Sequence, residues 1–201
     1  MPGLSAKGRE DYLLLLYFGP SPKSPVGRCV RRAYLDLSRT LHGISQIRGV
    51  QAHQLLAERL DDLVRTKSVV SQNEFDSWHR ILVIEMCDYY RDHGFPAFSV
   101  GQAQKWINMT LKYAITFGDE YIPAISRFFG LCHVPIDNII LQELAALGAP
   151  RVSARWSRLV DYSEYFSLQT WVRETFPHEK PLAVEFRLWK EGMEKRGQQS
   201  D

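Results

Sequence analysis

The chain has 201 residues, 45% of them apolar and 12% aromatic, and a formal net charge of +2. A chain of this length and composition forms one domain with a sizeable core, which excludes a disordered or fibrous protein. The weak positive charge permits nucleic-acid binding without arguing for it, so any contact with DNA depends on local basic clusters.

The three cysteines, Cys29, Cys87 and Cys132, are far apart in the sequence. They form no Cys-x-x-Cys motif and no Cys/His cluster, so the sequence indicates neither a zinc site nor a disulfide framework. No apolar run is long enough to span a membrane. We therefore expect a cytoplasmic protein with no metal, no cofactor and no membrane partner.

Helical periodicity predicts an all-α fold, a compact bundle of about seven to eight helices, and no run alternates as a strand would. Residues 1–25 are predicted to form an N-terminal arm and a Pro-rich linker, in which residues 11–18 are either a short helix or a strand. Residues 26–196 are predicted to form a single helical domain, followed by a frayed tail over residues 197–201.

In chain order, the patterns predict helices over residues 26–47, 50–66 and 71–92, with Gly49 separating the first two and a cap at Ser71 opening the third. The next helix enters through a Ser/Gly turn and covers residues 98–118. Another is opened by a turn at Pro135, and the last two cover residues 163–174 and 181–195.

Two basic clusters accompany these helices. Arg28, Arg31 and Arg32 form a basic edge that either follows phosphates or pairs with carboxylates such as Asp36. The second cluster follows Gly148 and contains Arg151, Arg155 and Arg158, with Trp156 between them.

The helix over residues 98–118 has two different faces. Lys105, Asn108 and Lys112 share one narrow stripe. The opposite side is formed by Ala103, Ile107, Thr110 and Ala114. This division predicts that the small apolar side is buried and that the polar stripe faces water or a ligand.

Asp137 follows Pro135 and Ile136 at the start of the next helix. The free N–H groups and the dipole of a helix N-terminus stabilise an ionised carboxylate there. One interpretation is that Asp137 is only an N-cap. The other is that it is a catalytic carboxylate, which stabilises a cationic transition state or deprotonates a nucleophile.

The order of a turn at Gly101, a helix carrying Lys105, an apolar segment and Pro135-Ile136-Asp137 resembles the helix-hairpin-helix DNA glycosylases. The resemblance covers residues 100–148. In that family the Asp of a Pro-Val-Asp turn is catalytic, and a Lys on the preceding helix is the Schiff-base nucleophile of the bifunctional members. It implies that Asp137 and Lys105 are catalytic, with Lys105 either attacking the sugar or holding a phosphate. Segments such as GQAQK also resemble small bacterial proteins, which implies no function.

The resemblance implies an enzyme that flips a damaged or modified base out of DNA, including the modified bases of viral DNA, and excises it to leave an abasic site. DNA is then the partner. The predicted substrate contacts are Gln104, Asn108, Lys112, Tyr121 and His133, and the predicted contacts to the DNA backbone are Arg31, Arg32, Arg151 and Arg155.

Two alternatives stay open. The residues from Arg173 to His178 resemble the Arg-x4-His motif of HEPN ribonucleases, which implies metal-independent RNA cleavage with Arg173 near His178 in a groove across a dimer. A non-catalytic helical module that binds nucleic acid or protein would leave Asp137 as a cap and Lys105 as a surface charge. Under the glycosylase hypothesis, Lys105 and Asp137 converge on an open pocket with aromatic walls.

Overall fold

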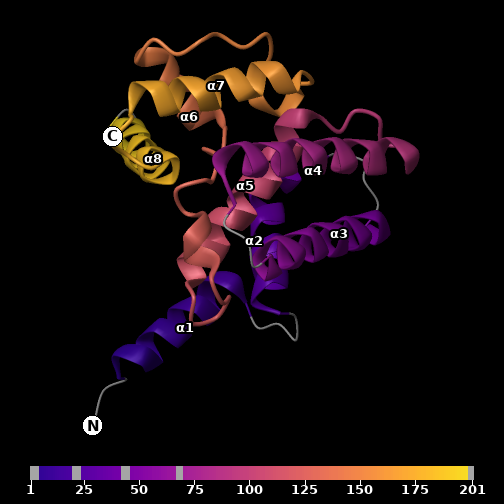
Figure 1. Cartoon of the computed structure of the whole chain (residues 1–201), viewed down its shortest axis with the longest axis vertical. Helices are drawn as coiled ribbons and strands as arrows, with labels where there is room; N and C mark the ends of the chain where they lie inside the picture. The colour runs from indigo at the N-terminus through magenta and orange to yellow at the C-terminus, as the bar shows by residue number, and fades with distance from the viewer. Residues whose placement is uncertain (1–4, 20–23, 42–45, 67–69, 199–201) are drawn as a thin grey trace.

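The computed structural model of the chain describes residues 5–19, 24–41, 46–66 and 70–198, which form α-helices and no strand (Figure 1). The predicted all-α fold is therefore confirmed for the described residues. The helices are α1 (Ala6–Phe18), α2 (Pro25–Leu37), α3 (Gln46–Arg65), α4 (Gln72–Asp92), α5 (Val100–Phe117), α6 (Asn138–Ala146), α7 (Tyr162–Thr175) and α8 (Pro181–Gln198). Short 3-10 turns are η1 (Ser38–Thr40), η2 (Ile125–Phe128) and η3 (Trp156–Arg158).

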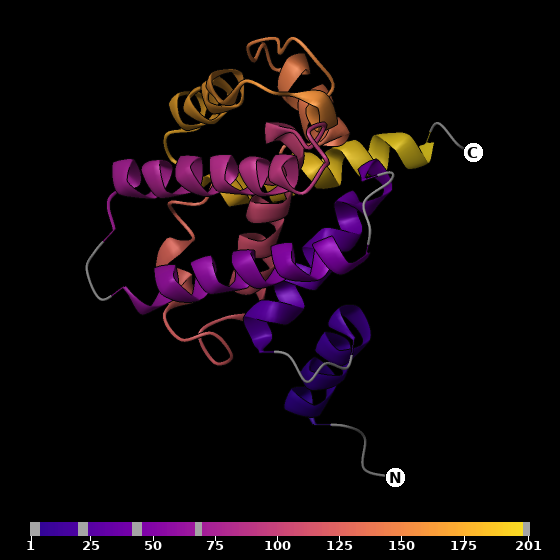
Figure 2. The same cartoon turned by 90° about the vertical axis from the view of Figure 1, so that its right-hand side faces the viewer.

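Helix α5 is the centre of the molecule. It is surrounded by α2, α4, α7 and the two turns η2 and η3 (Figures 1 and 2). Of its 18 residues, 15 are buried, and the three others, Lys112, Ile115 and Thr116, lie toward its C-terminal end. The buried side chains of the described residues form one connected core that extends from Phe18 in α1 to Leu188 in α8. Helix α1 lies at the end of the molecule opposite α7 and α8 (Figure 1).

The polar stripe on α5 is predicted to face water or a ligand, and its members differ: Lys105 and Lys112 line an open pocket, whereas Asn108 does not. Lys105 is 5% exposed and Asn108 only 1%, whereas the apolar side is buried as predicted. A helical wheel assigns a polar stripe to water because unpaired polar atoms are costly to bury. Here polar groups from α7, α8 and the segment before α6 bond the amines of Lys105 and Lys112 and the side-chain N–H of Asn108, which offsets most of the cost. Among the described residues, Asn108 Oδ1 has no hydrogen-bond partner.

The cap predicted at Ser71 is confirmed, but some of the predicted helix boundaries are wrong. Ser71 and Ser99 each form a capping box, at the starts of α4 and α5. The predicted helix over residues 26–47 ends at Leu37, and Gly49 lies inside α3 instead of separating two helices. Residues 6–18 of the predicted arm form helix α1, while residues 20–23 of the linker lie outside the described residues. Helix α8 continues to Gln198, so the first two residues of the predicted tail are helical.

No helix among the described residues combines the length and the apolar composition that crossing a membrane requires.

Gly101 allows η3 to approach the first turn of α5. Its backbone N–H donates a 2.9 Å hydrogen bond to the carbonyl oxygen of Leu159. A Cβ atom at this position would overlap the carbonyl group of Trp156. Gly101 is therefore required by close backbone contact.

We expect Gly101→Ala to lower the free energy of unfolding by about 2 kcal/mol or more, because α5 or η3 must move to admit the methyl group. Urea unfolding measures the change. Gly197→Ala is the control, since a Cβ at that helical position meets no atom within 4 Å. It should leave stability unchanged or slightly raised. Equal stability of wild type and Gly101→Ala would contradict the close contact.

Candidate functional site

Lys105 and Asp137 meet in the wall of an open pocket of about 730 Å³. Lys105 Nζ donates a 2.8 Å hydrogen bond to Asp137 Oδ2. The two residues are 32 positions apart in the sequence, and they are brought together because the segment before α6 packs against α5. A pocket of this size is typical of sites that enclose a small molecule or part of a larger one.

Asp137 is held by donors on both of its oxygens. Oδ1 accepts hydrogen bonds from the backbone N–H groups of Ile139 and Ile140, at 2.9 and 3.0 Å, so the predicted N-cap is present. Burial alone would raise the pKa of Asp137, but the charge of Lys105 and these bonds outweigh it and lower the pKa below its usual value. The carboxylate is therefore ionised and fixed in position.

A second ion pair lies in the same pocket. Both carboxylate oxygens of Glu185 in α8 accept hydrogen bonds from Lys112 Nζ, at 2.8 and 2.6 Å. Burial raises the pKa of Glu185 above its usual value, although Lys112 and Lys105 act in the opposite direction. The sequence reasoning missed Glu185, for which the available signal was an acid inside the apolar run of residues 182–186.

Aromatic and basic side chains form the rest of the pocket. Arg32 lies over the Tyr17 ring, 4.4 Å from its centroid, and pairs with Asp36 at 3.4 Å. Lys112 lies 5.7 Å from the centroid of the Trp189 ring. The remaining lining residues are Leu35, Arg39, Met109, Tyr113, Asn138, Ile139, Trp156, Phe186 and Arg196. The pocket therefore combines aromatic walls with positive charge at its edges.

Two glutamine side chains fix the backbone that leads to Asp137. Gln104 bonds both backbone groups of Ile136: its Nε2 donates to the carbonyl oxygen at 2.8 Å and its Oε1 accepts from the N–H at 3.1 Å. Gln169 in α7 pairs in the same way with Val134. Asn108 donates to Gln104 and to the Tyr165 hydroxyl. Gln104 and Asn108 therefore lie below the pocket and position Asp137, and neither lines the pocket wall.

His133 is also buried, with partners on both ring nitrogens. Its Nε2–H donates to Asp76 Oδ1 at 2.7 Å, and its Nδ1 accepts from the Tyr165 hydroxyl at 2.8 Å. Burial lowers the pKa of His133, against the opposing effect of Asp76, so the imidazole is neutral. Its place beneath the pocket makes it a support for the segment that carries Asp137.

Arg173 and His178, the two ends of the second motif, have different surroundings within the chain. Arg173 donates two hydrogen bonds of 2.8 Å to Asp76, which fixes it inside the same network as His133. His178 lies beyond the last residue of α7 and is exposed. Within one chain, Arg173 is therefore a member of the Asp76 network, and His178 is not.

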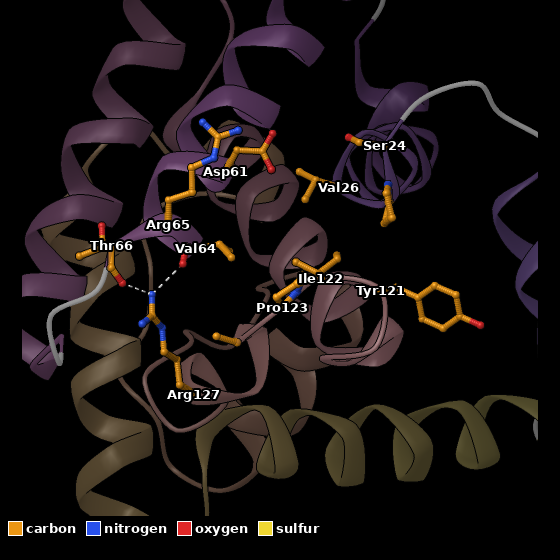
Figure 3. Close-up of a pocket in the computed structure, with 12 residues that line it drawn as sticks. Ser24, Val26, Asp61, Val64, Arg65, Thr66, Tyr121, Ile122, Pro123 and Arg127 are labelled. Atoms are coloured by element: carbon orange, nitrogen blue, oxygen red, sulfur yellow. Dashed lines mark hydrogen bonds between the residues drawn. The ribbon is translucent and has the colours of Figure 1, made fainter.

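Tyr121 lines a different pocket from Asp137. That pocket, of about 440 Å³, lies between the start of α2, the end of α3 and the segment after α5 (Figure 3). Arg127 is tied there to the backbone carbonyls of Val64 and Thr66. The Tyr121 hydroxyl donates to Asp11 in α1 at 2.5 Å. The structure thus gives Tyr121 no place in the wall of the Asp137 pocket.

The four arginines predicted to contact the DNA backbone separate into two groups. Arg32 lines the pocket, and Arg155 lines a groove next to it. Arg31 and Arg151 are exposed and line neither. Among the described residues there is no group of three or more His, Cys, Asp and Glu side chains placed to hold a metal ion.

Comparison of the chain with protein-family models, with curated proteins and with solved structures finds no match.

We expect Asp76→Asn to lower the free energy of unfolding at pH 7 by about 2 kcal/mol, because Arg173 and His133 lose a charged partner. Burial would raise the pKa of Asp76, but hydrogen bonds from His133, Arg173 and Gln72 hold it well below the usual 3.8. The contribution is therefore present above pH 4 and is lost as the pH falls toward the folded-state pKa. In urea unfolding, the difference in the free energy of unfolding between Asp76→Asn and wild type should become smaller between pH 4 and pH 2.

Asp92→Asn is the control, since Asp92 is an exposed carboxylate at the end of the same helix. It should change the free energy of unfolding little, both at pH 7 and in the acid range. A constant difference between wild type and Asp76→Asn across the acid range would rule out the ionised pair.

Proposed function

We propose that this protein is a DNA glycosylase that excises a base at the Lys105–Asp137 pocket. The observation that carries the proposal is the 2.8 Å ion pair between these two residues in the wall of an open pocket with Trp156, Trp189 and Tyr17 around it. The sequence resemblance assigns the catalytic roles to the same two residues. Aromatic walls suit an extruded base, which loses its stacking partners in the duplex and needs new ones.

Asp137 is suited to stabilise positive charge. Breaking the bond between C1′ and the base nitrogen leaves an oxocarbenium-like sugar, and a fixed carboxylate lowers the energy of that cation. A water molecule then bonds to C1′ and gives up a proton, while the departing base takes up a proton. Because the pKa of Asp137 is lowered, its main contribution is electrostatic and it is a weak base.

Lys105 is suited to act as an ammonium group. Its Nζ lies 2.8 Å from the carboxylate of Asp137, and an ammonium group in such an ion pair has no free electron pair with which to attack the sugar. In this form it orients Asp137 and attracts a phosphate of the substrate. We therefore propose hydrolysis by water without a covalent intermediate on Lys105.

The test is an abasic-site assay. Purified protein is incubated with single-stranded and duplex DNA carrying ordinary or modified bases, and abasic sites are revealed by cleavage with alkali. We expect Asp137→Asn to reduce the excision rate by about 100-fold or more, because the negative charge is lost while asparagine still caps α6. Borohydride should trap no covalent complex with the wild type.

Asp161→Asn is the matched control. Asp161 is the N-cap of α7, where it accepts from the N–H of Ser163 at 2.7 Å, and it lies outside the Lys105–Asp137 pocket. It should keep full activity. Excision by Asp137→Asn at the wild-type rate, or no abasic sites on any DNA with folded wild type, would refute the proposal. A trapped complex that disappears in Lys105→Ala would instead identify Lys105 as a nucleophile.

A further inference from the structure

We propose that the groove lined by Arg39, Arg155 and Arg158 binds the phosphodiester backbone of the nucleic-acid strand next to the nucleotide in the Lys105–Asp137 pocket. The inference rests on the proposed function, because it concerns the rest of the DNA strand that carries the nucleotide in the pocket. It adds Arg39 and Arg158 as phosphate ligands, and it defines where the strand runs on the surface.

The groove has a volume of about 600 Å³ and contains three arginines but no acidic residue. Its other lining residues are Thr40, Phe95, Ala97, Ser99, Gln102, Ser157 and Val160. All three arginines are exposed. In the parts of the chain that the structure describes, no carboxylate forms an ion pair with Arg39, Arg155 or Arg158.

Three guanidinium groups in one groove repel one another unless an anion lies between them. The planar guanidinium donates two parallel hydrogen bonds, a geometry that matches the oxygens of a phosphate. The groove is much larger than one phosphate group. It therefore suits a ligand that carries several phosphates along a chain, and the apolar Phe95 and Val160 offer contacts for the sugars or bases between them.

The groove adjoins the Lys105–Asp137 pocket. Arg39 lines both of them. On the other side the turn η3 separates the two, with Trp156 in the pocket wall and Arg155 and Ser157 in the groove wall. A strand with one nucleotide in the pocket therefore has a continuous positively charged path for its neighbouring phosphates.

Hydrogen bonds to α5 hold the backbone of η3, which contains Arg158 and has Arg155 as its N-cap. The Ser99 hydroxyl donates a 2.9 Å hydrogen bond to the carbonyl oxygen of Ser157, and the Gly101 N–H donates one to Leu159. The missing side chain of Gly101 lets the turn sit directly on α5. The backbone at Arg155 and Arg158 is thus fixed before a ligand binds, which lowers the entropy cost of binding.

The experiment measures binding of fluorescent oligonucleotides by anisotropy over a range of salt concentrations. It uses the full chain with Asp137→Asn, so that binding is measured without excision. In this background, the double variant Arg39→Gln/Arg158→Gln should bind about tenfold or more weakly at low salt. The slope of log affinity against log salt should fall by about 1.4 to 1.8, the value for two lost phosphate contacts on single or double strands.

Arg151→Gln is the matched comparison, because Arg151 is an exposed arginine on the segment leading to η3 that does not line the groove. Its removal should change affinity less than twofold. An equal effect of Arg151→Gln and of each groove arginine singly would overturn the proposal, since the binding would then report general charge. Unchanged melting temperatures confirm that each variant is folded.

Competitors identify the ligand chemistry. Polyglutamate should displace the oligonucleotide poorly, and inorganic phosphate should do so only at high concentration. If polyglutamate displaces the oligonucleotide as effectively as unlabelled DNA does, the assignment to a nucleic acid is overturned. If low concentrations of inorganic phosphate displace it, the groove binds a single anion and the proposal is overturned.

The abasic-site assay separates this inference from the proposed function. If the protein excises no base but the groove variants lose DNA binding, the proposed groove stands and the proposed glycosylase activity is rejected. If the groove variants excise bases and bind DNA as the wild type does, the proposed groove is rejected and the proposed glycosylase activity stands.

Discussion

The burial of polar side chains on α5 is the constraint on which the rest of the structure depends. Gln104 and Asn108 are about 1% exposed, and a buried amide without partners costs several kcal/mol. Within α5, Gln104 also donates to the carbonyl oxygen of Gly101 and Asn108 donates to Gln104, and the other partners come from outside the helix. The segment before α6 supplies them through Ile136, and α7 supplies them through Tyr165. Satisfying α5 therefore fixes the position of Asp137.

The same constraint explains why the pocket is rigid at its floor. Each backbone group of Val134 and Ile136 is paired with a glutamine side chain, so Asp137 follows a segment that has no freedom to slide. Asp76 anchors the far end of the segment through His133. A carboxylate held in this way needs little reorganisation when charge develops on a substrate, which is the property that electrostatic catalysis requires.

Features that depend on nearby residues were predicted from the sequence, and features that depend on the fold were not. Ser71 and Asp137 cap their helices, and a cap can be predicted because it involves only residues a few positions away. The surroundings of Lys105 and Asn108 depend on Asp137 at the start of α6 and on Tyr165 in α7, so a helical wheel could assign the two residues only to water or a ligand. Glu185 enters the pocket because α8 packs on α6, a contact that no local pattern encodes. The proximity of Lys105 and Asp137 was expected only through the family resemblance.

Paired and unpaired charges are distributed differently in and around the pocket. Within it, Lys105, Lys112 and Arg32 each have a carboxylate partner at 4 Å or less, so their fields largely cancel at a distance. Arg39, Arg155 and Arg158 in the groove have no such partner among the described residues. A polyanion approaching the protein is therefore attracted first by the groove. The paired groups act only at short range, so the negative charge of Asp137 is felt mainly inside the pocket.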